Sequence, residues 1–393
     1  MYDLVIKNGL LYDSASRSFF PGNLAVKDGK ICRLGEITES GARVIDADGL
    51  YVVPGLIDMH CHIFPTFPRM DDCLPTIYPD VHMIASGVTC AVDAGTCGLE
   101  DFLTFEKQVI HRSRIRIFAF LNIADGGMVR LSSEQEPGEF LPEAVGALAK
   151  CKDSIVGIKS AHYRTQGPFD TWYGPWQSVD AALKAGEIAG KPVMVDFKPV
   201  FPERTYEALL KRLRRGDIHT HVYAGHFDIL DENGKVREFV KEARRRGIVF
   251  DLGHGEGSFM LRHACPAYED GFYPDTISTD LYMDNVNGPA FDPISLMSKY
   301  LAVGMPFGEV IWHATAKPAE VIGHPELGVL REGGAADIAL IRKREGTFAF
   351  PDCEGRKVTG NTKLECCMTI KDGEILYNAE AMGLPDWKEE AGK

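Results

Sequence analysis

The two ends of the chain share one pattern, in which apolar and polar residues alternate. Residues 1–54 consist of short runs in which apolar and polar positions alternate, as in half-buried β-strands. The pair Asp28–Gly29 separates two such runs, and Asp-Gly in this position is a strong signal for a tight β-hairpin. We expect another turn at Asn8–Gly9. The same pattern returns near the C-terminus, where Asp372–Gly373 predicts a further hairpin.

Between these ends, short apolar runs alternate with helix-like stretches of ten or more residues. The helical patterns include 178–189, 204–213 and 234–246. The strand candidates are 56–62, 88–93, 115–121, 155–159, 193–196, 218–222, 248–252 and 276–280. Strands that alternate with helices in this way predict a (β/α)8 barrel, with a doubly wound open sheet as the structural alternative. We favour the barrel because polar residues end nearly every run, and barrels carry their active sites at that end.

These patterns predict an α/β protein with two structural units. Residues 55–330 are expected to form a (β/α)8 TIM-like barrel. Residues 1–54 and 331–393 are expected to fold together as one small β-sandwich domain beside it. Neither an internal repeat nor a low-complexity linker is found in the chain.

Composition narrows the classes of partner. The 393 residues are 45% apolar and 25% charged, which is ordinary for a globular protein, and carry a formal net charge of -13. This negative charge disfavours nucleic acid and anionic membranes as partners. No apolar run reaches transmembrane length, the start has no secretory signal pattern, and the ten cysteines contain no CxxC pair. We therefore expect reduced thiols and a cytoplasmic location.

One apolar run, at 53–62, ends in His60-Cys61-His62. Successive side chains of a strand alternate between its faces, so His60 and His62 point the same way. Neutral imidazole is the commonest protein ligand for metals such as zinc. Asp58 shares this face and is expected beneath the pair as a supporting partner. The run therefore predicts a metal site, although a His-x-His pair alone can be accidental.

The stretch VVPGLIDMHCH, which ends at His62, resembles the first barrel strand of the amidohydrolase superfamily, the metal-dependent hydrolases related to dihydroorotase and hydantoinase. The segment DLGHGEGSF at 251–259 is similar to a DxGHGxGSF segment in one branch of that superfamily, of amidohydrolase and deacetylase type. The resemblance extends to 314–319 and 333–337. It implies hydrolysis of an amide, either cyclic or N-acyl, or of a related ester, without naming the substrate.

The resemblance also implies roles for residues at the ends of later runs. Lys159 matches a lysine that carbon dioxide converts to a carbamate bridging two metal ions; without the resemblance, a buried ion pair would be the expectation. His221 matches the histidine ligand of the sixth strand, whereas His219 is expected to be packed and hydrogen-bonded. Asp280 matches the aspartate that touches one metal ion and shuttles a proton.

The fifth run departs from the family pattern, because Asp196 stands where the family carries a histidine ligand. A carboxylate can replace imidazole as a ligand, being shorter, harder and negative. Alternatively, Asp196 pairs with Lys198 and the second metal site is weakened or lost, with His226 as a candidate to compensate. The predicted metal ligands are His60, His62, Lys159, Asp196, His221 and Asp280.

Substrate contacts are expected from loops at the strand ends. The candidates are His162, Arg164, Lys198, His254 and Tyr282. The basic members of this set would suit a substrate that carries a carboxylate. For His254 the resemblance implies contact with substrate rather than metal, and a structural loop histidine is the alternative.

Together these features predict a hydrolase with two divalent ions, zinc or manganese, and a carboxylated Lys159. The ions would convert water to hydroxide near neutral pH, and Asp280 would carry its proton to the leaving group. A deaminase with one metal ion is the alternative within enzymes, and a degenerate oligomeric scaffold is the alternative outside them. We expect a homo-oligomer that acts on a small molecule and has no nucleic-acid or membrane partner.

Overall fold

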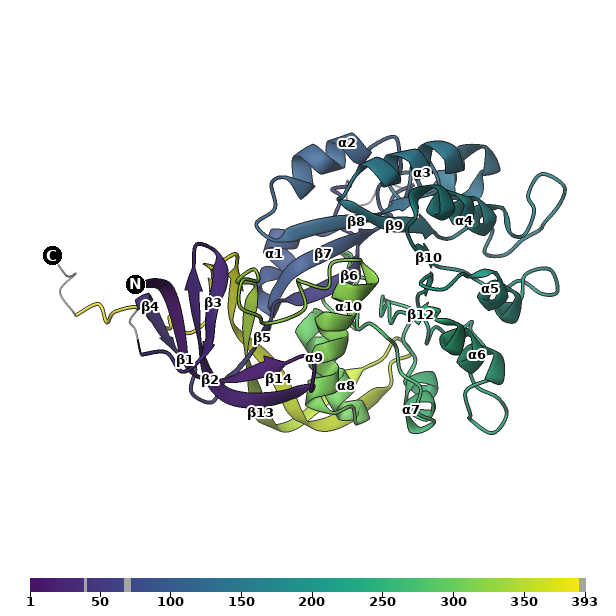
Figure 1. The fold of residues 1–393 in the computed structure, drawn as a ribbon. Coiled ribbons are helices and arrows are strands. Elements are labelled where there is room, and N and C mark those ends of the chain that lie inside the picture. The colour runs from purple at the N-terminus through teal and green to yellow at the C-terminus, as the bar shows by residue number, and fades with distance from the viewer. Residues whose placement is uncertain (39–40, 67–71, 389–393) are drawn as a thin grey trace.

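Seven of the predicted runs form one curled parallel sheet (Figure 1). The computed structural model describes residues 1–38, 41–66 and 72–388. Strands that follow one another in the chain are neighbours in this sheet. They are β6 (Leu56–Cys61), β7 (Val88–Ala94), β8 (Arg116–Asn122), β9 (Ile155–Ser160), β10 (Val193–Val195), β11 (Ile218–His219) and β12 (Val249–Phe250). Every residue of β6, β7 and β9 is buried, which explains why these runs are apolar on both faces.

The eighth predicted run, 276–280, differs from the prediction because it contains no regular strand. Its backbone nevertheless bonds in two directions. Leu252 N donates to Thr276 O, and Asp280 N donates to His60 O in β6. Asp280 has a left-handed backbone, with φ of 51°, which interrupts the extended geometry of a strand. The backbone thus leaves the extended conformation at Asp280, the residue that was predicted to shuttle a proton.

Helices pack along the outside of the parallel sheet, and α3 to α6 follow its curve in Figure 1. The three predicted helical patterns appear as α4, α5 and α6. α6 begins later than predicted because the Asp231 carboxylate accepts from Asn233 N and Lys235 N and holds a turn there. The helices are α1 (Pro79–His82), α2 (Phe102–Phe105), α3 (Pro142–Cys151), α4 (Gln177–Ala189), α5 (Tyr206–Arg212), α6 (Glu238–Arg246), α7 (Leu261–Glu269), α8 (Pro293–Val303), α9 (Phe307–Ala314) and α10 (Ala316–Val321). Shorter 3-10 or π turns are η1 (Ile84–Ser86), η2 (Glu106–Ile110), η3 (Leu131–Gln135) and η4 (Pro137–Glu139).

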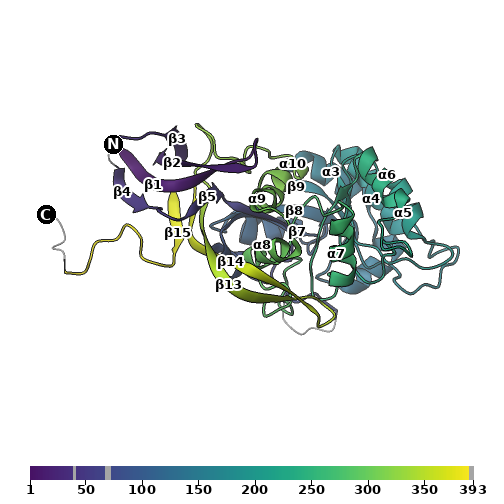
Figure 2. The same ribbon diagram turned by 90° about the horizontal axis from the view of Figure 1, so that it is seen from below.

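The two ends of the chain share a separate mixed sheet, in which purple and yellow strands lie side by side (Figure 2). Its strands are β1 (Tyr2–Asp13), β2 (Ser18–Lys27), β3 (Lys30–Gly35), β4 (Gly41–Asp46), β5 (Tyr51–Pro54), β13 (Ile338–Pro351), β14 (Lys357–Lys371) and β15 (Glu374–Asn378). The ends join where β5 pairs antiparallel with β13, with Val53 opposite Ala339. The sheet thus unites both ends, as expected, while the domain boundaries stay a prediction.

The turns of the mixed sheet follow the sequence signals in two of three cases. Asp28–Gly29 and Asp372–Gly373 each join two antiparallel strands, and all four residues have positive φ. Such backbones match the twist of a hairpin. The turn predicted at Asn8–Gly9 was wrong, because β1 continues through both residues with a bulge. Asn8 adopts φ of 60° there, and a Cβ at Gly9 would lie 2.5 Å from Val52 Cγ2. The described part of the chain contains no helix long and apolar enough to cross a membrane.

Candidate metal centre

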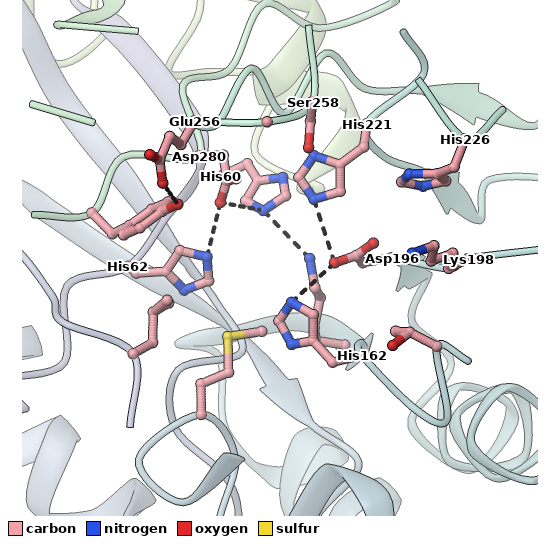
Figure 3. Close-up of a pocket in the computed structure, with 16 residues that line it drawn as sticks. His60, His62, His162, Asp196, Lys198, His221, His226, Glu256, Ser258 and Asp280 are labelled. Carbon is pink, nitrogen blue, oxygen red and sulfur yellow. Dashed lines mark hydrogen bonds and ion pairs between the residues drawn. The ribbon is translucent and has the colours of Figure 1, made fainter. Parts of the chain in front are cut away.

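A cavity of about 250 Å³ gathers most of the predicted site residues at the carboxyl ends of the parallel strands (Figure 3). Nine of the eleven predicted residues line it: His60, His62, Lys159, His162, Asp196, Lys198, His221, Asp280 and Tyr282. They come from the ends of β6, β9, β10 and β11 and the loops that follow them, and, for Asp280 and Tyr282, from the segment between α7 and α8. The parallel arrangement explains this convergence, because all strand ends of one polarity meet at the same edge.

His60, His62 and Asp280 form the tightest group of candidate ligands, with their donor atoms all within 4.8 Å of one another. Asp280 Oδ1 lies 3.3 Å from His60 Nε2 and 3.0 Å from His62 Nε2. Donors that bind one tetrahedral ion at about 2.1 Å stand roughly 3.4 Å apart, so these spacings fit a shared ion. Burial raises the pKa of Asp280, but His60 and His62 outweigh it and hold the pKa below its ordinary value.

A carboxylate behind His60 fixes the orientation of its ring. His60 Nδ1 lies 3.1 Å from Asp251 Oδ2, which leaves Nε2 to face the cavity. Asp251 is fully buried and also accepts from Thr220, Thr276 and Ser278. Burial raises the pKa of Asp251, but the bonds from His60, Thr276 and Ser278 outweigh it and lower the pKa. Asp251 is therefore a carboxylate that holds Nδ1–H in place, as in many metal-binding histidines.

The other two predicted histidine ligands are held in a similar way. His62 Nδ1 lies 2.9 Å from Thr96 Oγ1. His221 Nδ1 donates to Gly253 O over 2.7 Å, which assigns a proton to Nδ1 and directs Nε2 into the cavity. In all three rings Nε2 is thus the atom available for a metal ion.

Asp58 is not the partner of the histidine rings that the sequence suggested. Its carboxylate accepts from Thr279 Oγ1 over 2.5 Å, from Thr279 N over 3.1 Å and from His60 N over 3.3 Å. Burial raises its pKa to about 7. Asp58 therefore ties the backbone next to Asp280 to β6, while Asp251, which the sequence analysis missed, contacts His60. A polar residue within the apolar run 248–252 was the signal for it.

Lys159 is buried to 1% exposure and forms no direct ion pair in the part of the chain that the structure describes. Its Nζ lies 3.4 Å from His60 Nε2 and 3.6 Å from Met194 Sδ. Gly95 makes room for its stem, since a Cβ there would lie 2.5 Å from Lys159 Cγ. A buried ammonium without an anion is costly, so this amine fits a role in which it is modified or bound to an anion.

The carboxylate of Asp196 contacts two imidazoles. Its Oδ2 lies 3.5 Å from His221 Nε2 and 3.4 Å from His162 Nε2. The alternative ion pair between Asp196 and Lys198 is absent among the described residues. Burial raises the pKa of Asp196, but His221 and His162 outweigh it and hold the pKa well below its ordinary value. Asp196 is therefore an anion that points into the cavity (Figure 3).

Two predicted substrate contacts lie away from the cavity. The Arg164 guanidinium stacks 3.7 Å above the ring of Tyr173. His254 is fully buried, with Nε2 2.5 Å from Lys299 Nζ and its ring stacked on Phe259. The glycine-rich segment does approach the site, but through its backbone and through Glu256 and Ser258, which line the cavity. For these two residues the structure thus does not support the predicted substrate contacts, because their side chains fill other contacts.

Tyr282 forms part of the cavity wall, and its hydroxyl donates to Glu256 Oε2 over 3.2 Å. Glu134 was missed by the sequence analysis although its carboxylate lies 2.7 Å from His162 Nδ1. It lies in η3, distant from any strand end, so no local pattern marked it. His219 is packed as predicted, against Tyr206 and Phe227, but neither ring nitrogen has a hydrogen-bond partner among the described residues.

Comparison with known proteins agrees with this arrangement, although no protein-family model matches the chain. The chain is 30% identical over 383 residues to a deacetylase of Enterococcus faecalis strain V583, which covers 96% of this chain and 100% of the relative. The crystal structure of an adenine deaminase matches with a TM-score of 0.84 and 29% identity, covering 96% of this chain and 100% of that one. That of a dihydroorotase matches with a TM-score of 0.81 and 28% identity, covering 95% and 99%. The chain belongs to the amidohydrolase superfamily of metal-dependent hydrolases that act on carbon–nitrogen bonds.

Proposed function

We propose that this protein removes an acyl group from a small amide, or from a related ester, with the help of two divalent metal ions. The observation that carries the proposal is the convergence of two sets of donor atoms on one cavity. One set is His60, His62 and Asp280, and the other is Asp196 and His221. The deacetylase relative, aligned along its whole length, supports acyl transfer to water.

Lys159 would bridge the two donor sets as a carbamate. The neutral amine adds to carbon dioxide with loss of one proton, which gives an anion with two oxygens. This modification would remove the cost of a buried ammonium that forms no direct ion pair among the described residues. Bound zinc or manganese ions would lower the pKa of water and polarise the substrate carbonyl.

Asp280 is the residue that we expect to move the proton. Its Oδ1 is within 3.3 Å of two imidazoles, which keep the carboxylate ionised and ready to accept. It would take a proton from the attacking water and deliver it to the leaving nitrogen or oxygen. Its left-handed backbone directs the carboxylate toward the cavity rather than along a strand.

The substrate is proposed to carry a carboxylate. Lys198 lines the cavity and has no acidic partner in the described part of the chain, so its ammonium is available for an anion. His226 lines the same region. Opposite them, Tyr282 and Glu256 provide hydrogen-bonding groups for the rest of the molecule.

A deaminase with one metal ion is a second candidate. The match to an adenine deaminase structure and the replacement of a histidine by Asp196 favour it. Such a site would not need a carbamate on Lys159. The state of that lysine therefore separates the two functions.

We extend the proposal to the architecture. The segment 276–281 bonds to the chain after β12 and to β6, so we propose that it completes a (β/α)8 barrel. We also propose the boundaries 55–330 for the barrel and 1–54 with 331–393 for a β-sandwich. A homo-oligomer in the cytoplasm, without nucleic-acid or membrane partners, stays a prediction.

The test uses protein produced with bicarbonate and with zinc or manganese. N-acetyl amino acids, acetylated hydroxy acids, dihydroorotate and adenine are supplied separately, and products are quantified while metal content per chain is measured. Near two ions with release of acetate or another acid supports the proposal. One ion with release of ammonia from adenine would replace it with deamination. The mass of the intact chain under non-acidic conditions reports the carbamate.

A further inference from the structure

His162, in the loop after β9, is built into the cavity wall next to Asp196. Its Nε2 lies 3.4 Å from Asp196 Oδ2, the same oxygen that lies 3.5 Å from His221 Nε2. Figure 3 shows both rings directed at this carboxylate. Donors around one tetrahedral ion at about 2.1 Å are separated by roughly 3.4 Å, so Asp196 Oδ2 has the spacing of a co-ligand to each of the two histidine nitrogens.

The other nitrogen of His162 is held by a buried carboxylate. Nδ1 lies 2.7 Å from Glu134 Oε2, and Glu134 is only 1% exposed. The second oxygen of Glu134 accepts from Asn122 Nδ2 over 2.7 Å. A carboxylate that accepts the Nδ1 proton turns Nε2 toward the cavity, which is the arrangement behind most metal-binding histidines.

The backbone of His162 is fixed as well. Its carbonyl accepts from Gln135 Nε2 over 2.9 Å, and its φ of 51° is left-handed. His221 and Asp280, both proposed ligands, share this backbone conformation. His162 thus has the build of the predicted ligands: an anchored Nδ1, a directed Nε2 and a fixed main chain.

His226 is the rival for the same role, and its surroundings differ. Its ring contacts Phe227, and it forms no ion pair with Asp196 among the described residues. No carboxylate of the described chain pairs with its ring. His226 therefore lacks a carboxylate like the one that holds Nδ1 of His162.

We propose that His162 supplies an imidazole ligand to the second metal site, where Asp196 stands in place of the family's histidine. The second ion is then bound by His162, Asp196, His221 and the carbamate of Lys159. The inference rests on the proposed function for the presence of two ions, and it changes which residues bind the second one. The imidazole ligand would thus come from the loop after β9 rather than from the end of β10, and Glu134 would hold its Nδ1.

The test measures zinc binding rather than activity alone. Wild type, His162→Gln, Asp196→His and the double variant are stripped of metal and titrated with zinc against a chromophoric chelator in bicarbonate buffer. We expect His162→Gln to lower the affinity for the second zinc ion at least about tenfold and to leave the affinity for the first ion unchanged. In the double variant, the new histidine at 196 restores the second ion, which a merely structural role for His162 does not predict.

Two further variants keep the proposal falsifiable. Glu134→Gln retains the imidazole but removes its supporting charge, and we expect a loss of about 10- to 100-fold in affinity for the second ion. His226→Gln, the matched histidine variant, should keep both affinities. Cobalt substitution adds a spectroscopic readout, since loss of one imidazole alters the absorption of the second ion only. Circular dichroism verifies that each variant is folded.

The outcomes separate this inference from the proposed function. Two tight ions in His162→Gln, or loss of the second ion in His226→Gln, would overturn the role of His162 and leave binuclear hydrolysis intact. A wild type that binds fewer than two ions would overturn both. Two ions without hydrolysis of any acyl substrate would refute the proposed function while the ligand assignment stands.

Discussion

The backbone of Gly255 passes so close to Asp280 that a Cβ on residue 255 would lie 2.5 Å from Asp280 Oδ2. Gly255 also has φ of +58°, a conformation that side chains rarely adopt. Glycine is required here for two separable reasons, strain and collision. The position of Asp280, the proposed proton carrier, therefore depends on the absence of a side chain at Gly255.

Gly255→Ala is therefore expected to displace the Asp280 carboxylate. We predict a fall in kcat of at least about tenfold, together with a loss of about 1–2 kcal/mol of unfolding free energy from the left-handed backbone. Gly190→Ala is the matched control, because Gly190 has φ of +68° with open space around its Cβ. It should lose similar stability and keep full activity. Equal kcat values in both variants would show that the contact with Asp280 is unimportant.

Asp280→Asn removes the proton acceptor while keeping an oxygen of similar size. We expect kcat to fall by about 10²- to 10⁴-fold, since proton transfer by a positioned side chain contributes on that scale. Substrate binding is measured separately, by calorimetry, and metal content is determined for each preparation. Retention of more than a tenth of the wild-type kcat with both ions bound would eliminate Asp280 as the proton carrier.

Asp251→Asn tests the carboxylate behind His60. Because Asp251 Oδ2 lies 3.1 Å from His60 Nδ1, its loss should weaken zinc binding by about 10- to 100-fold. Asp217→Asn is the control, since Asp217 is equally buried but pairs with Arg214 outside the cavity. Competition with a chelator gives both affinities. An unchanged affinity in Asp251→Asn would mean that Thr220, whose Oγ1 lies 2.9 Å from His60 Nδ1, orients the ring without it.

Lys299 predicts a pH dependence of stability. Burial lowers its pKa to about 7 from an ordinary value of 10.5, so the unfolded chain binds more protons than the folded one between these values. Stability should therefore rise as pH increases from 7 toward 10. Lys299→Met should remove this rise, and the exposed Lys184→Met should retain it. Urea unfolding at pH 7, 8 and 9 measures the slopes, and parallel slopes in all three proteins would contradict the prediction.

The sequence predicted those parts of the fold that local patterns determine. The run that ends in His60 and His62 is a buried strand, and Asp28–Gly29 is a hairpin, because short-range sterics and apolar burial specify both. The Asn8–Gly9 signal misled, since the same residues also fit a bulge within a continuous strand. The run at 276–280 misled because its partners on either side, rather than its own composition, determine its backbone.

The site shows the same division between local and distant causes. Strand ends identified most of the cavity lining, because parallel strands bring their ends together. His254 lies in a sequence motif that suggested contact with substrate, yet its Nε2 contacts Lys299, which lies in a helix distant in the sequence. Glu134 gives no signal at all, since its importance lies in the single contact with His162. Such contacts join residues whose proximity only the folded chain reveals.

The pairing of β5 with β13 has a consequence for synthesis. Val53 finds its partner Ala339 only after the whole parallel sheet has been translated. At about 5–20 residues per second, a ribosome needs roughly 15 to 60 seconds to supply that partner. During this interval the edge of β5 is unpaired and open to wrong pairing with other nascent chains. The β5 edge is therefore the place where an incomplete chain is open to association until β13 covers it.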